Sequence, residues 1–164
     1  MSISKQYVRD FFTRTSSVKE ILRKKISILK KKKPKDLDQN MQHFHSIYEL
    51  QINCLDCANC CKTLSPAVTD VDISRLAKFL KIKPSRLVSE YFLLDNEGDY
   101  VFQSTPCPFL GDDNYCVVYE ARPRACKEYP HTDRRRALQL LQITEKNADV
   151  CPIVFNVLLD LPYT

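Results

Sequence analysis

Apolar residues recur at helical intervals over residues 4–31, with basic residues between them. The apolar positions are Tyr7, Val8, Phe11, Phe12, Val18, Ile21, Leu22, Ile26 and Leu29. This spacing predicts an amphipathic helix. Short hydroxyl residues favour caps over helix interiors, so the run Thr15-Ser16-Ser17 is expected to break the helix. Pro34 ends the pattern.

Three further helices are expected before residue 95. Residues 36–51 carry an apolar side and lead directly into Cys54. Thr69 is expected to cap a helix that runs to about Leu80, because acidic residues follow it in the first turn. Pro84 suits the first turn of another helix, which we expect to end near residue 92.

The remainder of the chain predicts one small hairpin and two more helices. Residues 95–99 predict a turn and residues 100–103 a short strand, with which residues 115–118 could pair as a second strand. Residues 133–147 and 153–161 are expected to be helical. The predicted fold class is therefore mainly α with a small β-hairpin. The cysteines are expected in loops between helices, where metal binding would supply the missing order.

Charge divides the chain into two parts. Residues 1–35 contain 12 Lys and Arg against 2 Asp and Glu, a net charge of +10, whereas residues 36–164 have a net charge of −5. We therefore expect a basic amphipathic helical arm over residues 1–35 and a cysteine-cluster domain over residues 36–164. A basic arm suits nucleic acid, an anionic membrane surface or an acidic partner, although it can also be a solvated helix face.

The expected compartment decides how the cysteines are interpreted. No segment has the roughly 18–20 apolar residues of a membrane span. The N-terminus lacks the pattern of a secretory signal, because charged residues interrupt any apolar region. A cytoplasmic location is therefore expected. Structural disulfides are rare in that compartment, so metal ligation is favoured over disulfide bonding.

The eight cysteines form one constellation within 98 residues. They are Cys54, Cys57, Cys60, Cys61, Cys107, Cys116, Cys126 and Cys151. The first four form a C-x2-C-x2-C-C string. Three cysteines at this spacing favour an iron–sulfur cluster, because ferredoxin-type strings use it, whereas zinc motifs usually supply cysteines in pairs. All eight are candidate ligands, of a 4Fe–4S cluster first and of zinc as the alternative.

The number of centres stays open from sequence alone. Eight thiolates fit two four-cysteine sites, but their grouping cannot be deduced from spacing. Cys60 and Cys61 are adjacent and cannot easily point the same way, so one is expected to serve another centre or to stay a thiol. Basic residues flank the ligands and could offset the negative charge of a four-thiolate centre. They are Lys62, Arg122, Arg124 and Lys127.

These cysteines and their neighbours resemble the YkgJ-type CxxCxxCC cysteine-cluster family, described as zinc- or iron-chelating. The resemblance covers about residues 50–152. Besides the string at 54–61, it rests on Cys107-Pro108-Phe109-Leu110, Cys116, Tyr119-Glu120, Arg122-Pro123, Cys126, Tyr129-Pro130 and Cys151. Lys127 replaces the family's Arg. The resemblance implies metal binding more firmly than a reaction.

Three functions remain open at this point. The first is an iron–sulfur protein with a redox or catalytic role, such as an oxidoreductase with a redox or protein partner. The second is a zinc-chelating structural or binding module. The third is an S-adenosylmethionine-dependent modifying enzyme, because flagellin lysine N-methylases share a similar cysteine domain. His43, His45 and His131 are further candidate ligands, although surface or packing roles are more usual for such residues.

Overall fold

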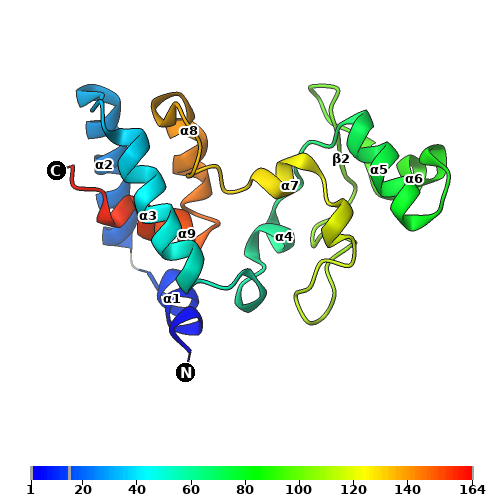
Figure 1. Cartoon of the computed structure of the whole chain (residues 1–164), viewed down its shortest axis with the longest axis horizontal. Coiled ribbons are helices and arrows are strands. Elements are labelled where there is room, and N and C mark those ends of the chain that lie inside the picture. The colour runs from blue at the N-terminus through cyan, green and yellow to red at the C-terminus, as the bar shows by residue number, and fades with distance from the viewer. Residues whose placement is uncertain (1, 15, 164) are drawn as a thin grey trace. The chain divides into compact units, whose positions relative to one another are not determined.

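Helices dominate the residues that the structure describes, 2–14 and 16–163 of a computed structural model, and one two-stranded antiparallel hairpin accompanies them (Figure 1). The predicted fold class is confirmed. The chain divides into two compact units, of which the first comprises Met1–Cys57 and Pro130–Thr164 and the second Ala58–Tyr129.

The first unit consists of helices from both ends of the chain. They are α1 (Ile3–Phe12), α2 (Ser16–Lys32), α3 (Leu37–Gln51), α8 (Ala137–Asn147) and α9 (Pro152–Asp160), with the single 3-10 turn η1 (Cys54–Asp56). The helical stretch predicted over 4–31, with a break at Thr15-Ser16-Ser17, forms two helices, α1 and α2. Ser16 and Ser17 begin α2, and Thr15 lies outside the described residues. The helices expected over 36–51 and 153–161 are both present.

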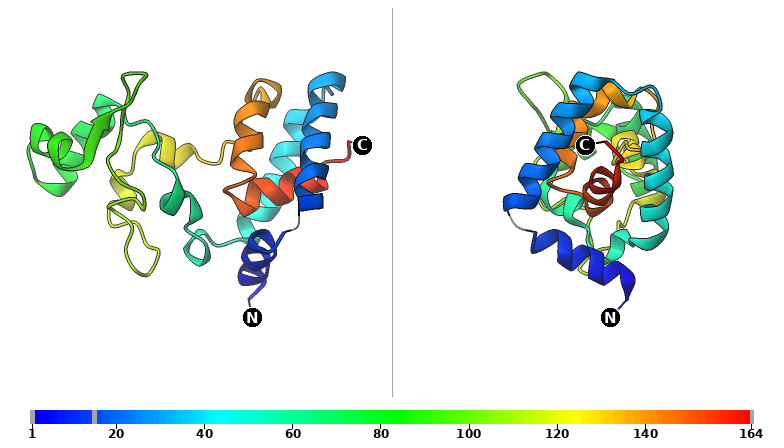
Figure 2. Two further views of the ribbon diagram at one scale, coloured as in Figure 1. Left: turned by 180° about the vertical axis from the view of Figure 1, so that it is seen from behind. Right: turned by 90° about the vertical axis from the view of Figure 1, so that its left-hand side faces the viewer.

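Helix α9 supplies the core of the first unit. Its sequence is apolar on nearly all sides, and α1, α2, α3 and α8 all pack against it, as the right-hand view of Figure 2 shows. Phe155 meets Phe11 edge to face, with ring centroids 5.6 Å apart. Lys25 Nζ donates to the carbonyl oxygens of Leu159 and Leu161 at 2.6 and 2.8 Å, so it satisfies acceptors that the helix end leaves open.

Most basic residues of α2 are exposed, whereas its apolar residues Leu22, Ile26 and Leu29 are buried. Lys25 is half-buried because it contacts the end of α9. Because α2 packs against α8 and α9, the predicted boundary at residue 35 lies inside the first unit. No helix among the described residues is both long enough and apolar enough to span a bilayer.

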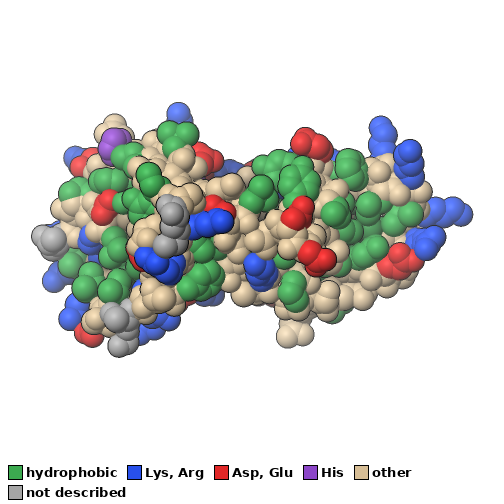
Figure 3. Space-filling view, turned by 90° about the horizontal axis from the view of Figure 1, so that it is seen from below, with side chains coloured by type: hydrophobic (Ala, Val, Ile, Leu, Met, Phe, Trp, Pro, Cys, Tyr) green, Lys and Arg blue, Asp and Glu red, His purple; other side chains and the backbone are tan. Residues whose placement is uncertain are grey.

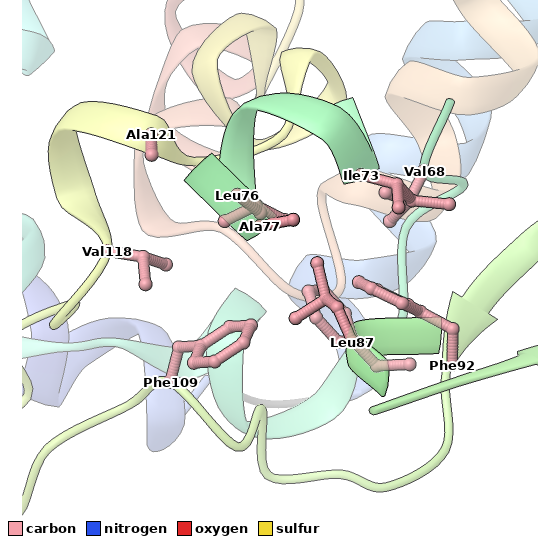
Figure 4. Close-up of a cluster of buried hydrophobic side chains, with 10 residues drawn as sticks. Val68, Ile73, Leu76, Ala77, Leu87, Phe92, Phe109, Val118 and Ala121 are labelled. Atoms are coloured by element: carbon pink, nitrogen blue, oxygen red, sulfur yellow. The ribbon is translucent and has the colours of Figure 1, made fainter. Parts of the chain in front are cut away.

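The second unit contains shorter elements. They are α4 (Asn59–Thr63), α5 (Asp70–Leu80), α6 (Pro84–Tyr91), β1 (Phe92–Leu94), β2 (Tyr100–Phe102), η2 (Tyr119–Ala121) and α7 (Arg124–Glu128). Its core lies between α5, α6, the hairpin and the segments that follow. Figure 4 shows Leu76, Leu87 and Phe109 converging there with Val118 and Ala121.

Local signals set the helix starts of this unit as predicted. Thr69 caps α5 through a capping box in which its side chain accepts from the Asp72 N–H and the Asp72 carboxylate accepts from the Thr69 N–H. Pro84 occupies the first turn of α6.

The predicted pairing of the hairpin is wrong. Residues 100–102 pair with Phe92–Leu94 and not with residues 115–118. The Asp95 carboxylate accepts from the backbone N–H of Glu97 and Asp99 at 2.9 and 3.0 Å, and Gly98 adopts a φ of 86°. This turn reverses the chain immediately, so the strand pairs with its neighbour in sequence. Cys116 instead makes a single antiparallel bridge with Leu110.

Helix α8 begins at Ala137, four residues later than predicted. Arg136 has a φ of 65°, which an α-helix interior does not accommodate. The Asp38 carboxylate accepts from the backbone N–H groups of Arg136 and Ala137 at 2.8 and 2.7 Å, so it satisfies the new N-terminus from α3. Residues 134–136 therefore lie outside the helix.

Candidate metal centre

All eight cysteines belong to the described residues, and none forms a disulfide. They lie in or beside short elements between the longer helices. Cys54 is in the η1 turn, Cys60 and Cys61 are in α4, Cys126 is in α7, and Cys57, Cys107, Cys116 and Cys151 lie outside helices. Such short elements have few internal hydrogen bonds, so their positions depend on contacts with the rest of each unit.

Four thiols of the second unit, Cys61, Cys107, Cys116 and Cys126, are close enough for each ionised group to affect the others. We call them the four-thiol set. Burial, followed by the charges of the other three, raises the pKa of Cys126 to about 12. The charges of Cys61 and Cys116 likewise raise the pKa of Cys107. The charge of Cys61 also raises the pKa of Cys116. Every pair in the set therefore interacts, although its members come from four separate segments.

Backbone contacts bring these segments together. The Cys107 N–H donates to the Cys61 carbonyl at 2.8 Å, which joins α4 to the segment after β2. The Gly111 N–H donates to the Tyr115 carbonyl at 2.8 Å, which closes the loop between Cys107 and Cys116. A Cβ at position 111 would lie 2.8 Å from Asp113 Oδ1 and 3.3 Å from that carbonyl, so a larger residue here would displace the Asp113 carboxylate.

Two of the thiols accept backbone hydrogen bonds in the same way. Burial raises the pKa of Cys107 to about 11, and the N–H of Phe109 partly offsets this rise by donating to the sulfur. Burial also raises the pKa of Cys116, and the N–H of Val118 partly offsets this rise by donating a hydrogen bond to the sulfur. In both cases the donor lies two residues after the cysteine. Such donors favour the thiolate, which is the form that binds metals.

Cys61 is the member of the set with the lowest thiol pKa. A hydrogen bond from Cys60 and the charges of Lys62 and Arg122 lower its pKa to about 7 against the effect of burial. The Arg122 charge also favours the ionised forms of Cys116 and Cys126. One guanidinium therefore acts on three of the four thiols.

Arg122 is held beside the thiols by an aromatic ring and by its own backbone. Its guanidinium carbon lies 3.7 Å from the centroid of the Tyr119 ring. Its carbonyl accepts from Arg75 Nη2 at 2.8 Å. Its Nε is buried and has no hydrogen-bond partner among the residues that the structure describes. The side chain thus presents a positive charge and an unused donor near the four-thiol set.

A buried carboxylate fixes the segment that carries Arg122. Asp72 is 2% exposed, and it accepts from Arg75 Nη2 at 2.5 Å and from the Arg124 N–H at 3.0 Å. Thr69 donates to the same carboxylate. This network ties α5 to the start of α7, two residues before Cys126. The sequence indicated Asp72 only as one of the acidic residues in the first turn after Thr69, so this role was missed.

Three thiols of the first unit, Cys54, Cys57 and Cys151, form a second group that we call the three-thiol set. Burial raises the pKa of Cys151 to about 12, and the charges of the other two add to the rise. The N–H groups of Ile153 and Val154, in the first turn of α9, donate to the Cys151 sulfur and partly offset this rise in its pKa. The start of a helix therefore favours the thiolate at this position.

In both sets the thiols are neighbours, but they do not yet have the geometry of a metal coordination site. Within residues 2–14 and 16–163, no three His, Cys, Asp or Glu side chains are placed to hold an ion as they stand. The donors are chemically suited to zinc or to iron–sulfur clusters, since thiolate is the preferred ligand of both. Coordination would draw each set closer, as is usual where metal binding and folding are coupled.

The candidate histidines do not strengthen either set. His45 is buried, with Nδ1 2.7 Å from Thr132 Oγ1 and Nε2 3.6 Å from Glu49, so it has a packing role. His43 is exposed beside the ring of Phe44. His131 is half-buried with a φ of 70°.

Comparison with known proteins agrees with this chemistry. The model of one family, CxxCxxCC, described as a "Putative zinc- or iron-chelating domain", matches residues 53–152. The matched region covers more than half of the chain and contains all eight cysteines. Searches of curated proteins and of solved structures gave no match.

Proposed function

The chain belongs to the CxxCxxCC family of zinc- or iron-chelating domains, and from this premise we propose that it is an iron–sulfur protein with a redox role. The four-thiol set would bind one cluster of the 4Fe–4S type, which takes four cysteine thiolates. The observation that carries the proposal is the mutual proximity of Cys61, Cys107, Cys116 and Cys126 from four separate segments.

The surroundings of the four-thiol set support a charged cluster. An oxidised 4Fe–4S centre with four thiolates has a net charge of about −2. Arg122 and Lys62 place positive charge beside it. The N–H groups of Phe109 and Val118 donate to two of the sulfurs. Charge and hydrogen bonds to sulfur are the main means by which a protein sets the reduction potential of a cluster.

The three-thiol set would bind a second centre in the first unit. Cys151 is oriented by the start of α9, and Cys54 and Cys57 follow α3 at the C-x2-C spacing that lets one loop supply two ligands. Cys60 would act on the four-thiol set through its hydrogen bond to Cys61.

A redox role is supported by the position of the ligands near the surface. Cys61, Cys107, Cys116 and Cys126 are all half-buried rather than enclosed. A cluster bound by such ligands would lie within reach of a protein partner for electron exchange. Shielding by Arg122 and Tyr119 would limit its exposure to water.

Zinc is the second candidate, and one feature favours it. The loop between Cys107 and Cys116 closes on a single bridge and directs two N–H groups at two sulfurs. Structural zinc sites commonly take two thiolates from one loop, although here eight residues separate the cysteines instead of the usual two to four. In that case the domain would be a zinc-stabilised binding module without a redox role.

Anaerobic purification followed by metal and sulfide analysis tests the proposal. We expect a brown protein with iron and acid-labile sulfide in equal amounts. Cys126→Ser should remove the iron of the four-thiol set, and Cys151→Ser should remove that of the three-thiol set. Thr63→Ser, which changes an exposed hydroxyl residue of α4, is the matched control and should leave both unchanged.

The outcomes separate the candidates. A colourless protein with stoichiometric zinc and no sulfide would overturn the iron–sulfur proposal in favour of the zinc module. Equal loss of all metal in both variants would contradict the assignment of two independent centres. Metal content that is unchanged in Cys126→Ser would remove Cys126 from the ligands.

A further inference from the structure

Two basic runs that lie far apart in the sequence meet at one end of the first unit. The first is Lys30–Lys33 with Lys35, and the second is Arg134–Arg136. Helix α2 ends, α3 begins and α8 begins at this end of the helix group, as both Figure 1 and the left-hand view of Figure 2 show. We call the surface formed by residues 30–38 and 133–137 the basic end.

Specific contacts hold the two runs together. The Asp38 carboxylate accepts from the backbone N–H groups of Arg136 and Ala137, 98 and 99 residues away. Gln42 Nε2 donates to the Asp133 carbonyl at 3.1 Å. Lys30 and Glu145 form an ion pair at 3.1 Å between α2 and α8. The basic end is therefore a fixed part of the fold.

The basic end has a high density of positive charge. Its two segments contain eight Lys and Arg against three Asp, a net charge of +5, which equals the formal net charge of the full chain. All the lysines and two of the three arginines are exposed. Within the described part of the chain, no carboxylate lies within ion-pair distance of Lys31, Lys33, Lys35, Arg135 or Arg136.

Collecting like charges at one place costs stability, which a bound anion would offset. The backbone is also strained in both runs, since Lys33 and Arg136 have φ values of 46° and 65°. The face of the first unit that Figure 3 shows, on the opposite side, carries acidic and basic side chains together.

We propose that the basic end binds the sugar–phosphate backbone of nucleic acid. Lysine and arginine recognise phosphate without regard to base sequence. An anionic membrane attracts the same charges, but it lacks the further contribution that exposed apolar side chains make by inserting between lipids. No large hydrophobic side chain is exposed within residues 30–38 or 133–137, and Leu138 is the nearest one that is.

Fluorescence anisotropy of the full-length, metal-loaded protein with labelled duplex DNA and duplex RNA of mixed sequence tests this proposal. Affinity for at least one duplex should fall linearly with the logarithm of salt concentration. Lys31→Gln and Arg135→Gln should each reduce the slope by about one, and the double variant by about two. Arg135 is informative because it lies outside residues 1–35.

Lys78→Gln/Lys83→Gln, two exposed lysines of the second unit, is the matched control and should leave the slope unchanged. Metal content and the thermal unfolding temperature should match the wild type in all variants. Binding to neither duplex at low salt would overturn the proposal, as would binding only to vesicles containing anionic lipid. An effect of Lys31→Gln without one of Arg135→Gln would show that the two runs do not form one surface.

Discussion

At the scale of single residues, buried charges organise the surroundings of the thiols. Asp72 joins the cap of α5 to Arg75 and to the start of α7. Arg75 in turn donates to the carbonyl of Arg122, whose guanidinium favours the thiolates. A carboxylate that is 2% exposed is therefore linked to the four-thiol set through two arginines.

Asp72→Asn should lower the free energy of unfolding by about 2 kcal/mol near neutral pH, because it removes a buried carboxylate charge that accepts hydrogen bonds from Thr69, Arg75 and Arg124. Burial raises the pKa of Asp72, but hydrogen bonds from Thr69, Arg124 and Arg75 outweigh it and lower that pKa below its usual value. The stabilisation is therefore present above the unfolded pKa and is lost as the pH falls through the folded one. Urea unfolding of the variant and wild type across acidic pH measures this.

The difference between the two proteins should shrink in acid, where Asp72 is protonated in both states. Asp70→Asn, an exposed acid of the same helix turn, is the control and should change stability little. A pH-independent difference would contradict a role for the Asp72 charge.

Arg122→Gln should weaken zinc binding by the four-thiol set about tenfold, because it removes the positive charge that favours three of the thiolates. If a cluster is bound, its reduction potential should become more negative for the same reason. Chelator competition and potentiometric titration measure the two quantities.

Arg122→Lys should preserve most of the effect of the charge while losing the stacking on Tyr119. Arg86→Gln, whose guanidinium pairs with Glu90 in α6, is the control. Equal loss in the Lys and Gln variants would show that packing, and not charge, is the role of Arg122.

At the scale of elements, helix α9 is the one on which the first unit depends most. Four helices pack against it, and its preceding residue is the thiol Cys151. The helix thus combines a structural role with hydrogen bonds to one thiol of the three-thiol set. In the second unit the comparable element is α5, whose cap residue Thr69 and buried Asp72 position the segment before Cys126.

Leu158→Ala should destabilise the first unit by about 3 kcal/mol, because Leu158 is 0% exposed and its removal leaves a cavity among four helices. Leu50→Ala is the matched control, since Leu50 is 89% exposed and its truncation should change stability by less than about 0.5 kcal/mol. Thermal unfolding followed by circular dichroism compares them. Equal destabilisation by the two substitutions would contradict the assignment of α9 to the core.

At the scale of the whole molecule, the two units have different means of stabilisation. The first unit buries a helix that is apolar on nearly all sides. The second has fewer residues and shorter elements, and residues 103–129 contain only one 3-10 turn and one five-residue helix. A small unit with little regular structure gains most from a bound metal.

Removing metal with a chelator under reducing conditions should therefore affect the units unequally. Amide hydrogen exchange should accelerate in residues 107–126, whose position depends on the four-thiol set. The central amides of α9 should remain protected. Exchange that accelerates equally in α9 would contradict a separate metal dependence of the second unit.

Local sequence determined much of this protein. The cap at Thr69, the proline at position 84 and the apolar run of residues 153–161 predicted helices that the structure contains, because each signal acts within one or two helical turns. The cysteine spacing and its neighbouring residues indicated the family that the comparison confirmed. These features depend on residue type and short-range order along the chain.

Only the tertiary structure decided what depends on residues far apart. It paired Tyr100–Phe102 with Phe92–Leu94, because the turn at Asp95 places these two strands side by side. It divided seven of the thiols into a set of four and a set of three, and it brought Arg134–Arg136 beside the lysines at the end of α2. Hydrogen bonds and packing over tens of residues set these contacts, and neither periodicity nor spacing records them.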